Sequence, residues 1–412
     1  MKAKIKYEKF SCKRGDLNIR GFSFLSQSGK LEVNSGKKLK PVVVSHAFSK
    51  THKTTDSFAR KMAEWGYAAF TFDFCGGSCC SKSDGKTSDM TVESQIQDLT
   101  SVVEYVSSLD YIDRDELVLL GAGFGGLISS LVAVRLKTPI KKLILFFPTF
   151  CVPDDARSGQ IMTTRFDPDN PPEIIECGHM KLGRRYIVEA QKVNVIKELE
   201  QYSGPVCIIH GDRDSLVDIQ YSKDAMQIFR ANSRDKADTL NKQLFTISGA
   251  THGFNKMHEY YAMNIVEQFL QNRFQLMDIS VNIKENKMVR EKGVKTEVAV
   301  FGGKASGEFF SGKIQEGAKN LEKWKVRKPL SLISSYVIKG VDYTGQRIKI
   351  EFENQSADGK KWEQKITTDS KALKLLGIEG KSQMVMEYGN SGPYMRLFLP
   401  TEGIQFMQAD KK

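Results

Sequence analysis

The strongest constraint on the fold is an alternation in the first 270 residues, where short apolar runs alternate with longer amphipathic segments. Apolar runs of about four to eight residues are typical of strands that are buried on both faces of a parallel sheet. The longer segments repeat their apolar residues with helical spacing, as crossover helices do. The pattern therefore predicts an α/β domain with a mostly parallel sheet. The predicted strands are 41–48, 67–74, 116–123, 141–148, 205–212 and 242–252.

One interval, residues 149–200, does not follow this alternation. It is long and rich in Pro, Asp and Gly, as in PDDARSGQ and RFDPDNPPE. Long irregular segments inside a compact domain are often active-site lids. We therefore expect residues 149–200 to form a lid insertion over one end of the sheet.

The pattern changes after Phe274, where runs with strand character are separated by turn residues and helical periodicity almost disappears. The segment VDYTGQRIKI predicts a hairpin with its turn at 343–346. A chain of 412 residues also exceeds the roughly 100–200 residues that one domain usually contains. We expect an α/β domain over 1–274 and a small antiparallel β-barrel domain over 275–412.

Charge and composition exclude several classes of function. The net charge is +12, but the basic residues are interleaved with acidic ones rather than gathered into a stripe that a nucleic-acid backbone would need. No stretch of 18 apolar residues occurs, and the N-terminus lacks the pattern of a secretory signal. We expect a cytoplasmic protein with a small-molecule substrate, no nucleic-acid or membrane partner, and a possible homo-oligomeric state.

The seven cysteines contain no C-x-x-C pair of the kind that zinc sites use. We expect them to be free thiols in a reducing compartment. The sequence implies neither a metal nor an organic cofactor.

Four short motifs lie at the ends of predicted strands, and their order along the chain is informative. They are VVVSHAF, LVLLGAGFGG, HGDRDSLVD and GATHGF. The order of turn after a central strand, then acid, then histidine is the order of an α/β-hydrolase triad. A catalytic imidazole needs a carboxylate on its second nitrogen to fix its tautomer and orientation. Asp214 and His252 are the candidates for this pair.

These motifs, together with FDFCGGSCCSKSDGKTSDMTVESQIQDL, make the first 270 residues similar to the α/β-hydrolase fold. They resemble in particular the small bacterial cinnamoyl/feruloyl esterases and their peptidase-like relatives. The resemblance implies that Asp214 is the triad acid and that His252 is the general base. It also implies that the backbone N–H groups of Phe48 and Phe124 form the oxyanion hole.

In the similar esterases the insertion covers an aromatic acyl group. The resemblance therefore implies that substrate-binding residues lie in the lid, while His46 shapes the loop of the oxyanion hole beside the substrate. Each lid residue could equally serve only to pack the lid on the sheet. The candidate lid residues are Phe150, Met162, Phe166, Met180 and Tyr186.

The chain departs from the family at the position of the nucleophile. The elbow motif G-x-S-x-G is GAGFG here, so Gly123 stands where the serine would be. Glycine has no side chain that could attack a carbonyl, and it relieves the backbone strain of the elbow. Gly123 is either natural or an engineered replacement, and the sequence leaves both open.

Two other interpretations of the same region remain open. Gly121, Gly123 and Gly126 also match the dinucleotide fingerprint G-x-G-x-x-G, but the motif follows the third predicted strand and lacks the acidic residue after the next one. A thiol of Cys75, Cys79 or Cys80 could replace the serine, or His252 could activate a water molecule directly.

Residues 276–408 resemble a bacterial β-barrel family of unknown function, on the segments GGKASGEFFSGKI, SYVIKGVDYTGQRIKIEFEN and YMRLFLP. The segment contains no histidine, which argues against a histidine-based catalytic or metal site. We expect this domain to bind a ligand, to form a second wall of the active site, or to serve dimerisation or stability.

The sequence as a whole predicts an enzyme of the α/β-hydrolase fold that acts on a carbonyl substrate, an aromatic or small acyl ester. One alternative is a lyase or isomerase that uses His252, Asp214 and the oxyanion hole without covalent catalysis. The other alternative is a catalytically inactive protein that binds a small molecule.

Overall fold

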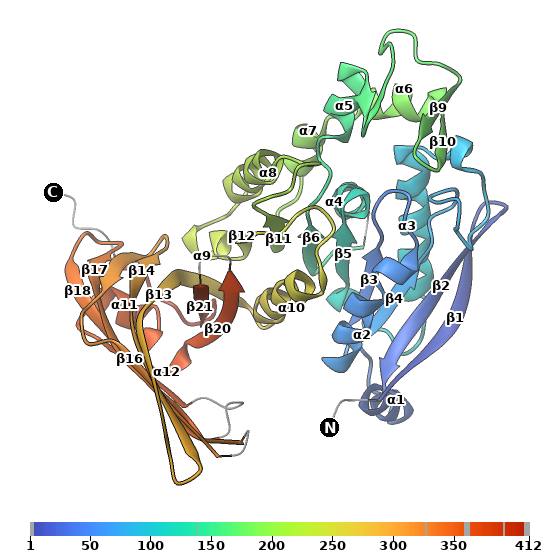
Figure 1. Cartoon of the computed structure of the whole chain (residues 1–412). Helices are drawn as coiled ribbons and strands as arrows, with labels where there is room; N and C mark the ends of the chain where they lie inside the picture. The colour runs from blue at the N-terminus through green and yellow to red at the C-terminus, as the bar shows by residue number, and fades with distance from the viewer. Residues whose placement is uncertain (1–3, 137, 326–327, 358–362, 390–391, 408–412) are drawn as a thin grey trace. The chain divides into compact units, whose positions relative to one another are not determined.

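The computed structural model describes residues 4–136, 138–325, 328–357, 363–389 and 392–407. The chain divides into two compact units, Met1–Val266 and Glu267–Lys412 (Figure 1). This division falls within α10 (Lys256–Leu270), eight residues before the boundary at 274/275 that the sequence pattern suggests. Each unit has a sheet of its own.

The first unit contains an eight-stranded mixed sheet. The strands run parallel from β4 to β12, and β1 and β2 are antiparallel to their neighbours. The six strands predicted from the apolar runs are confirmed, whereas the alternation did not reveal the N-terminal hairpin of β1 and β2. The order is β1 (Ile5–Arg14), β2 (Leu17–Ser26), β4 (Ala68–Phe72), β3 (Pro41–Ser45), β5 (Val118–Ala122), β6 (Lys142–Phe146), β11 (Val206–Gly211), β12 (Lys242–Ile247).

Helices cover both faces of this sheet. On one face α3 (Val92–Ser107), α4 (Phe124–Arg135), α7 (Val195–Leu199) and α8 (Ile219–Ala231) contact one another in that order. On the other face α2 (Asp56–Glu64) packs on β2, β3 and β4, and its Ser57 hydroxyl lies 3.5 Å from a carboxylate oxygen of Glu259 in α10. The shorter helices are α1 (Gln27–Asn34), η1 (His52–Thr54), η2 (Thr87–Asp89), η3 (Arg114–Glu116) and α9 (Lys236–Thr239).

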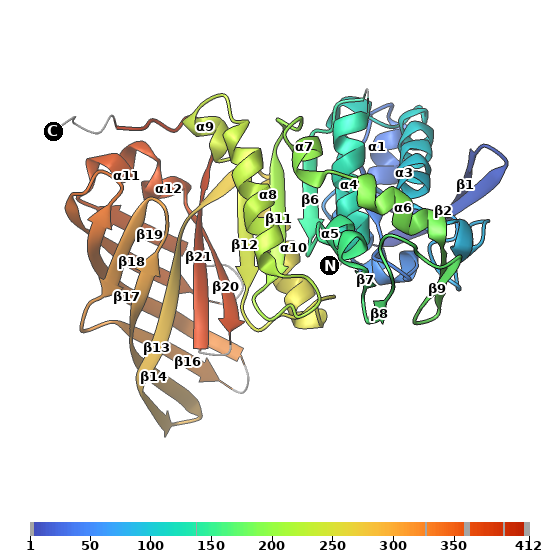
Figure 2. The same cartoon turned by 90° about the horizontal axis from the view of Figure 1, so that it is seen from above.

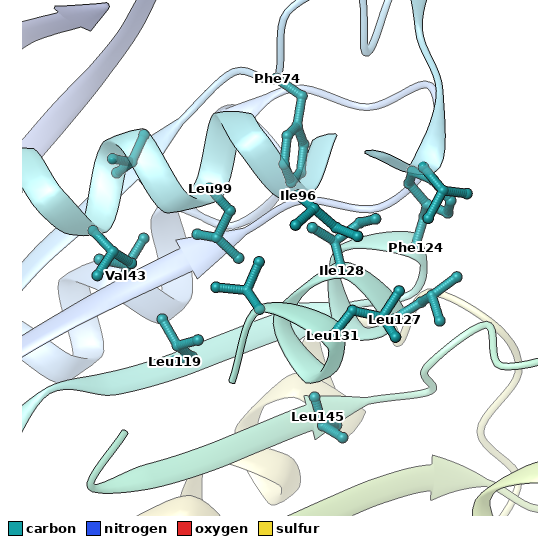
Figure 3. Close-up of a cluster of buried hydrophobic side chains, with 14 of the residues drawn as sticks. Val43, Phe74, Ile96, Leu99, Leu119, Phe124, Leu127, Ile128, Leu131 and Leu145 are labelled. Atoms are coloured by element: carbon teal, nitrogen blue, oxygen red, sulfur yellow. The ribbon is translucent and has the colours of Figure 1, made fainter. Parts of the chain in front are cut away.

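The core between the sheet and α3 and α4 explains why the central strands are apolar throughout. Figure 3 shows side chains of β3, α3, β5, α4 and β6 meeting in one cluster, among them Val43, Leu99, Leu119, Leu127 and Leu145. All five are fully buried. Because burial of one such side chain contributes about 1.5–3 kcal/mol, this cluster stabilises the packing of α3 and α4 on the central strands.

The predicted insertion, residues 149–200, folds into short elements at one end of the first unit (green in Figure 1). A hydrogen bond of 3.0 Å from the Thr87 hydroxyl to the Lys181 carbonyl ties it to η2. Its elements are α5 (Val152–Ser158), β7 (Gln160–Ile161), β8 (Thr164–Arg165), β9 (Ile174–Cys177), β10 (Met180–Gly183), α6 (Arg184–Lys192) and α7.

The second unit is a nine-stranded antiparallel sheet. In the described part of the chain its end strands, β19 and β20, are not paired with each other, so closure into the expected barrel stays a prediction. The strands are β13 (Arg273–Glu291), β14 (Val294–Ser306), β15 (Phe310–Ile314), β16 (Lys319–Lys325), β17 (Lys328–Asp342), β18 (Arg347–Ser356), β19 (Glu363–Thr368), β20 (Gln383–Gly389) and β21 (Gly392–Pro400).

Two features of this unit follow from local sequence. The predicted hairpin joins β17 to β18, where the Gly345 N–H donates to the Asp342 carbonyl at 2.9 Å and the Asp342 N–H donates to the Gln346 carbonyl at 3.0 Å. Two short helices, α11 (Lys371–Leu375) and α12 (Ile378–Lys381), lie between β19 and β20. Throughout the described ranges of both units, no helix is long and apolar enough to cross a membrane.

Candidate active site

The site is built on the sharp turn between β5 and α4. Gly123 occupies this turn with φ +54° and ψ −118°, a conformation that strains residues with a side chain. The flanking glycines allow the helix to start close to the sheet. A Cβ on Gly121 would lie 2.3 Å from the Gly125 carbonyl oxygen, and a Cβ on Gly125 would lie 2.5 Å from the His46 carbonyl oxygen. The turn therefore has the backbone of a nucleophile elbow.

Gly123 faces the imidazole of His252. A Cβ placed on Gly123 would lie 3.5 Å from His252 Nε2 and 3.0 Å from the Ala47 Cβ. An oxygen one bond beyond that Cβ would be within hydrogen-bond reach of the ring nitrogen. The turn thus has room for a side-chain oxygen next to His252, at a residue that has no side chain.

His252 and Asp214, which the sequence predicts as a pair, lie together in the structure. His252 Nδ1 is 2.8 Å from Asp214 Oδ2. The carboxylate is fully buried, whereas the imidazole is 18% exposed and can therefore be reached from outside. Because a carboxylate only accepts hydrogen bonds, Nδ1 carries the proton and Nε2, on the side of Gly123, can act as a base.

Several donors converge on Asp214. Burial alone would raise its pKa, but hydrogen bonds from His210, His252 and the Val217 N–H hold the pKa well below its ordinary value. The N–H groups of Leu216 and Val217 both donate to Oδ1 at 3.0 Å. Asp214 is therefore ionised and fixed in position at neutral pH.

His210 belongs to the same cluster as Asp214, although the sequence analysis does not select it. Its Nε2 lies 3.1 Å from both Asp214 Oδ2 and the Val217 carbonyl, so Nε2 carries the proton and donates. Its Nδ1 lies 2.8 Å from the Ser222 hydroxyl. The spacing His-x-x-x-Asp in HGDRD was the available signal, since it places both residues at the end of one strand.

The two predicted oxyanion donors flank the elbow. Phe124 is the first residue of α4, so its N–H lies at the positive end of the helix dipole. Within the described residues, the N–H groups of Phe48 and Phe124 have no protein acceptor. The two aromatic rings contact each other edge to face, with centroids 6.0 Å apart.

His46 is held by the backbone. Its Nε2 accepts a hydrogen bond of 3.1 Å from the Phe74 N–H, so its Nδ1 carries the proton and donates to the Ala47 carbonyl at 2.8 Å. Burial lowers its pKa, which keeps the ring neutral. His46 thus links the loops after β3 and β4, and neither ring nitrogen is left for a substrate.

The candidate lid residues occupy different environments. Tyr186 of α6 is buried, with its ring 6.4 Å from Phe48 and 6.2 Å from Phe124. Phe150 and Met180 are buried in the core cluster, and Phe166 packs against it. Met162 is 52% exposed. Of these residues, Tyr186 contacts the oxyanion side of the site.

Phe147 is a further residue of the site, one for which no motif provided a signal. It follows β6 with φ +38°, which is unusual for a residue with a side chain. Its ring packs edge to face on the His252 imidazole with centroids 4.8 Å apart. Phe147 therefore fixes the plane of the base, and the strained backbone is consistent with a constraint of this kind.

A hollow of about 180 Å³ lies between the lid and α8, lined by Phe150, Asp154 and Tyr221 among others. None of Gly123, Asp214 or His252 lines it. It is therefore separate from the site at the elbow.

The cysteines considered as replacement nucleophiles differ in exposure. Cys75 is buried, and burial raises the pKa of its thiol to about 12, which disfavours the reactive thiolate. Cys79 and Cys80 are exposed, with their sulfur atoms 3.7 Å apart. In the ranges that the structure describes, no group of three or more His, Cys, Asp or Glu side chains is arranged to hold a metal ion.

Comparison with known proteins bears on the fold of the first unit. The sequence model of the serine aminopeptidase S33 family matches residues 36–168. None of the curated protein sequences compared with the chain matches it significantly.

Solved structures resemble the first two thirds of the chain. One is Est1E from Butyrivibrio proteoclasticus with ferulic acid bound, which is 25% identical, with a TM-score of 0.55 over 63% of this chain and 98% of that one. A second Est1E structure is 23% identical, with a TM-score of 0.53 over 64% and 97% of the two chains. A hypothetical protein from Pseudomonas aeruginosa is 14% identical, with a TM-score of 0.50 over 65% and 94%. The first unit therefore has an α/β-hydrolase fold, and these findings support a hydrolase-type function.

Proposed function

We propose that the first unit hydrolyses carboxylic esters, with a water molecule in the place of the missing serine oxygen. The observation that carries the proposal is the distance of 3.5 Å between a Cβ position on Gly123 and His252 Nε2. This space admits an oxygen nucleophile next to the base. The buried Asp214, bonded to His252 at 2.8 Å, supports the base as it gains a proton.

The chemistry needs only one nucleophilic step. His252 Nε2 takes a proton from water while the water oxygen forms a bond to the ester carbonyl carbon. The carbonyl oxygen gains the negative charge and is stabilised by the N–H groups of Phe48 and Phe124. The tetrahedral species then collapses, the bond to the leaving oxygen breaks, and His252 returns its proton to that oxygen. No covalent acyl-enzyme forms.

We propose an aromatic acyl group as the substrate class. Support comes from the ring contacts of Phe48, Phe124 and Tyr186 at the oxyanion side of the site, because such rings can pack against an aromatic acid. Further support comes from the structural likeness to Est1E, whose bound molecule is ferulic acid.

The proposal is tested by hydrolysis of p-nitrophenyl acetate and p-nitrophenyl ferulate. We expect release of p-nitrophenol that is linear from the first turnover, since no acyl-enzyme accumulates. His252→Ala is expected to lower the rate by about 10²–10⁴-fold, the usual contribution of a general base.

The matched control is His258→Ala, which removes a histidine from α10 that does not contact Asp214 and should keep the full rate. Hydrolysis no faster than in buffer, or an equal rate in His252→Ala, would refute the proposal.

A further inference from the structure

The second unit contains a cavity of about 810 Å³ that is lined by its own strands and open on one side to solvent. The lining side chains come from β13, β14 and β16 to β21, and from the short segment before β20. In both views β17 and β18 lie on the opposite side of this unit from β20 and β21 (Figure 1 and Figure 2). Cavities of this volume suit small-molecule ligands.

One wall of the cavity carries a continuous row of polar side chains. Asn320, Ser334, Asn354 and Gln364 are paired neighbours on the successive strands β16, β17, β18 and β19, and all four line the cavity. Neighbouring strands are about 4.8 Å apart, so the row spans roughly 14 Å. Its side chains form a hydrogen-bonding surface long enough for one small molecule.

The row contains both an acceptor and a donor for which the described residues provide no partner. Asn320 Oδ1 and Gln364 Nε2 are each buried without a hydrogen bond to any residue of the described ranges. The other end of the Asn320 amide is occupied, because its Nδ2 donates to Glu322 Oε1 at 3.0 Å. The second oxygen of Glu322 accepts a bond of 3.0 Å from the Trp324 indole. Buried polar groups are almost always satisfied, so these two atoms indicate a ligand that bonds to them.

The opposite wall is apolar and adaptable. Met384, Met386 and Tyr388 project from one face of β20, and Met395 follows on β21. Met386 is 45% and Tyr388 62% exposed, although both line the cavity. Methionine side chains can adjust to ligands of different shape. An apolar body placed against this wall would cover surface that is otherwise exposed.

On the other face of β20 and β21 the buried polar side chains are hydrogen-bonded to one another. There Arg396 is buried and donates to both oxygens of Glu387, at 2.9 and 3.3 Å, and to Gln275 at 3.0 Å. These polar groups satisfy one another. Unpartnered side-chain atoms are thus found on the cavity side and not in this buried cluster.

The charge of the cavity limits the ligand further. Glu322 contributes a carboxylate next to the polar row and disfavours an anionic group there. The other charged side chain of the lining, Arg273, donates to the Lys381 carbonyl at 2.8 Å.

We propose that the second unit binds an uncharged amphipathic small molecule, with a hydrogen-bonding edge, which both donates and accepts, along the row from Asn320 to Gln364. Its apolar body lies against the methionines of β20 and β21.

The test uses two fluorescent probes with the same aromatic body, added to the full chain. N-phenyl-1-naphthylamine is uncharged and has one N–H donor, whereas 8-anilinonaphthalene-1-sulfonate adds a negative charge. We expect saturable binding of the uncharged probe, and about tenfold weaker binding of the sulfonate because of Glu322. In Glu322→Gln this difference between the probes should become much smaller.

Adjacent serines on β17 provide a matched pair of variants. Ser334 lines the cavity, whereas Ser335 is exposed. Ser334→Phe should weaken binding of the uncharged probe about tenfold by filling the cavity, and Ser335→Phe should leave it unchanged. Equal unfolding midpoints show that both variants are folded.

Three results would overturn the proposal: no binding of the uncharged probe, equal affinities of the two serine variants, or tighter binding of the sulfonate. Because His252→Ala changes only the other unit, it should not affect probe binding. The outcome is therefore independent of the proposed hydrolysis.

Discussion

The candidate sites of the two units differ in how their polar groups are placed. In the α/β unit Asp214 and His252 follow the ends of β11 and β12, and the buried Asp214 accepts hydrogen bonds from both His210 and His252. In the β unit the polar side chains of the row lie within strands, and Asn320 and Gln364 each have an atom without a partner among the residues that the structure describes. A site made of fixed charges is suited to chemistry, whereas a row of unsatisfied amides is suited to binding.

The largest effect that would sharpen this comparison is expected at Asp214. Asp214→Asn removes the charge that supports His252 and favours the wrong tautomer, so ester hydrolysis should fall by about 10³–10⁴-fold. Probe binding in the β unit should not change. The control is Asp212→Asn, in which an exposed carboxylate that bonds to the Gly249 N–H is replaced, and it should keep most of the activity. Equal losses in both variants would contradict the role of Asp214.

In the β unit the largest effect is expected on stability. Arg396→Met leaves Glu387 buried without its partner, which should lower the free energy of unfolding by about 3–5 kcal/mol. The control is Arg185→Met, which removes an exposed pair with Glu189 and should cost less than about 1 kcal/mol. Urea unfolding measures both. If Arg396→Met lowered the free energy of unfolding by as little as the control does, the buried pair of Arg396 and Glu387 would be contradicted.

The α/β unit should become less stable in acid, because Asp214 is then protonated. Since its folded pKa lies below the ordinary value, the stabilisation is complete above the unfolded pKa of about 3.9 and is lost as the pH falls toward the folded pKa. The difference in unfolding free energy between the protein and Asp214→Asn should therefore be about 1–3 kcal/mol and constant from pH 5 to 7. Below pH 4 it should shrink. A difference that grows in acid would contradict the assignment.

A smaller effect is expected at the elbow. Gly123→Ala places a side chain at φ +54° and 3.0 Å from the Ala47 Cβ, which should cost about 1–3 kcal/mol. The control is Gly178→Ala, because Gly178 has a similar φ of +60° but nothing within 4 Å of an added Cβ. This variant has the backbone strain without the steric contact, so its loss of unfolding free energy should be smaller. Thermal unfolding provides the measurement. No loss at Gly123 would mean that the elbow relaxes when a side chain is present.

The comparison also explains what the sequence could predict. The strands 41–48 and 116–123 were recognisable because burial on both faces makes a parallel strand apolar throughout. Asp214 and His252 were recognisable because strand ends of a parallel sheet converge, so motifs far apart in sequence belong to one site. His210 was missed although its spacing from Asp214 is visible in HGDRD. Phe147 was missed because its contact with His252 depends on a neighbour that only the fold brings close.

For the β unit the sequence predicted the strands but not the binding cavity between them. Asn320, Ser334, Asn354 and Gln364 lie on four different strands, and no short motif contains more than one of them. Their common row depends on the pairing register, which alternation within one strand does not determine. The cavity therefore had no counterpart in the sequence analysis.

The most direct test of the account is restoration of the nucleophile. Gly123→Ser is mixed with p-nitrophenyl ferulate, and both the early time course and the mass of the intact protein are measured. The account predicts a burst of one p-nitrophenol per chain and a feruloyl adduct, both abolished when His252→Ala is added, whereas the unchanged protein shows neither. A folded Gly123→Ser protein that gives no burst and no adduct would contradict the claim that Gly123 occupies the nucleophile position of a working hydrolase site.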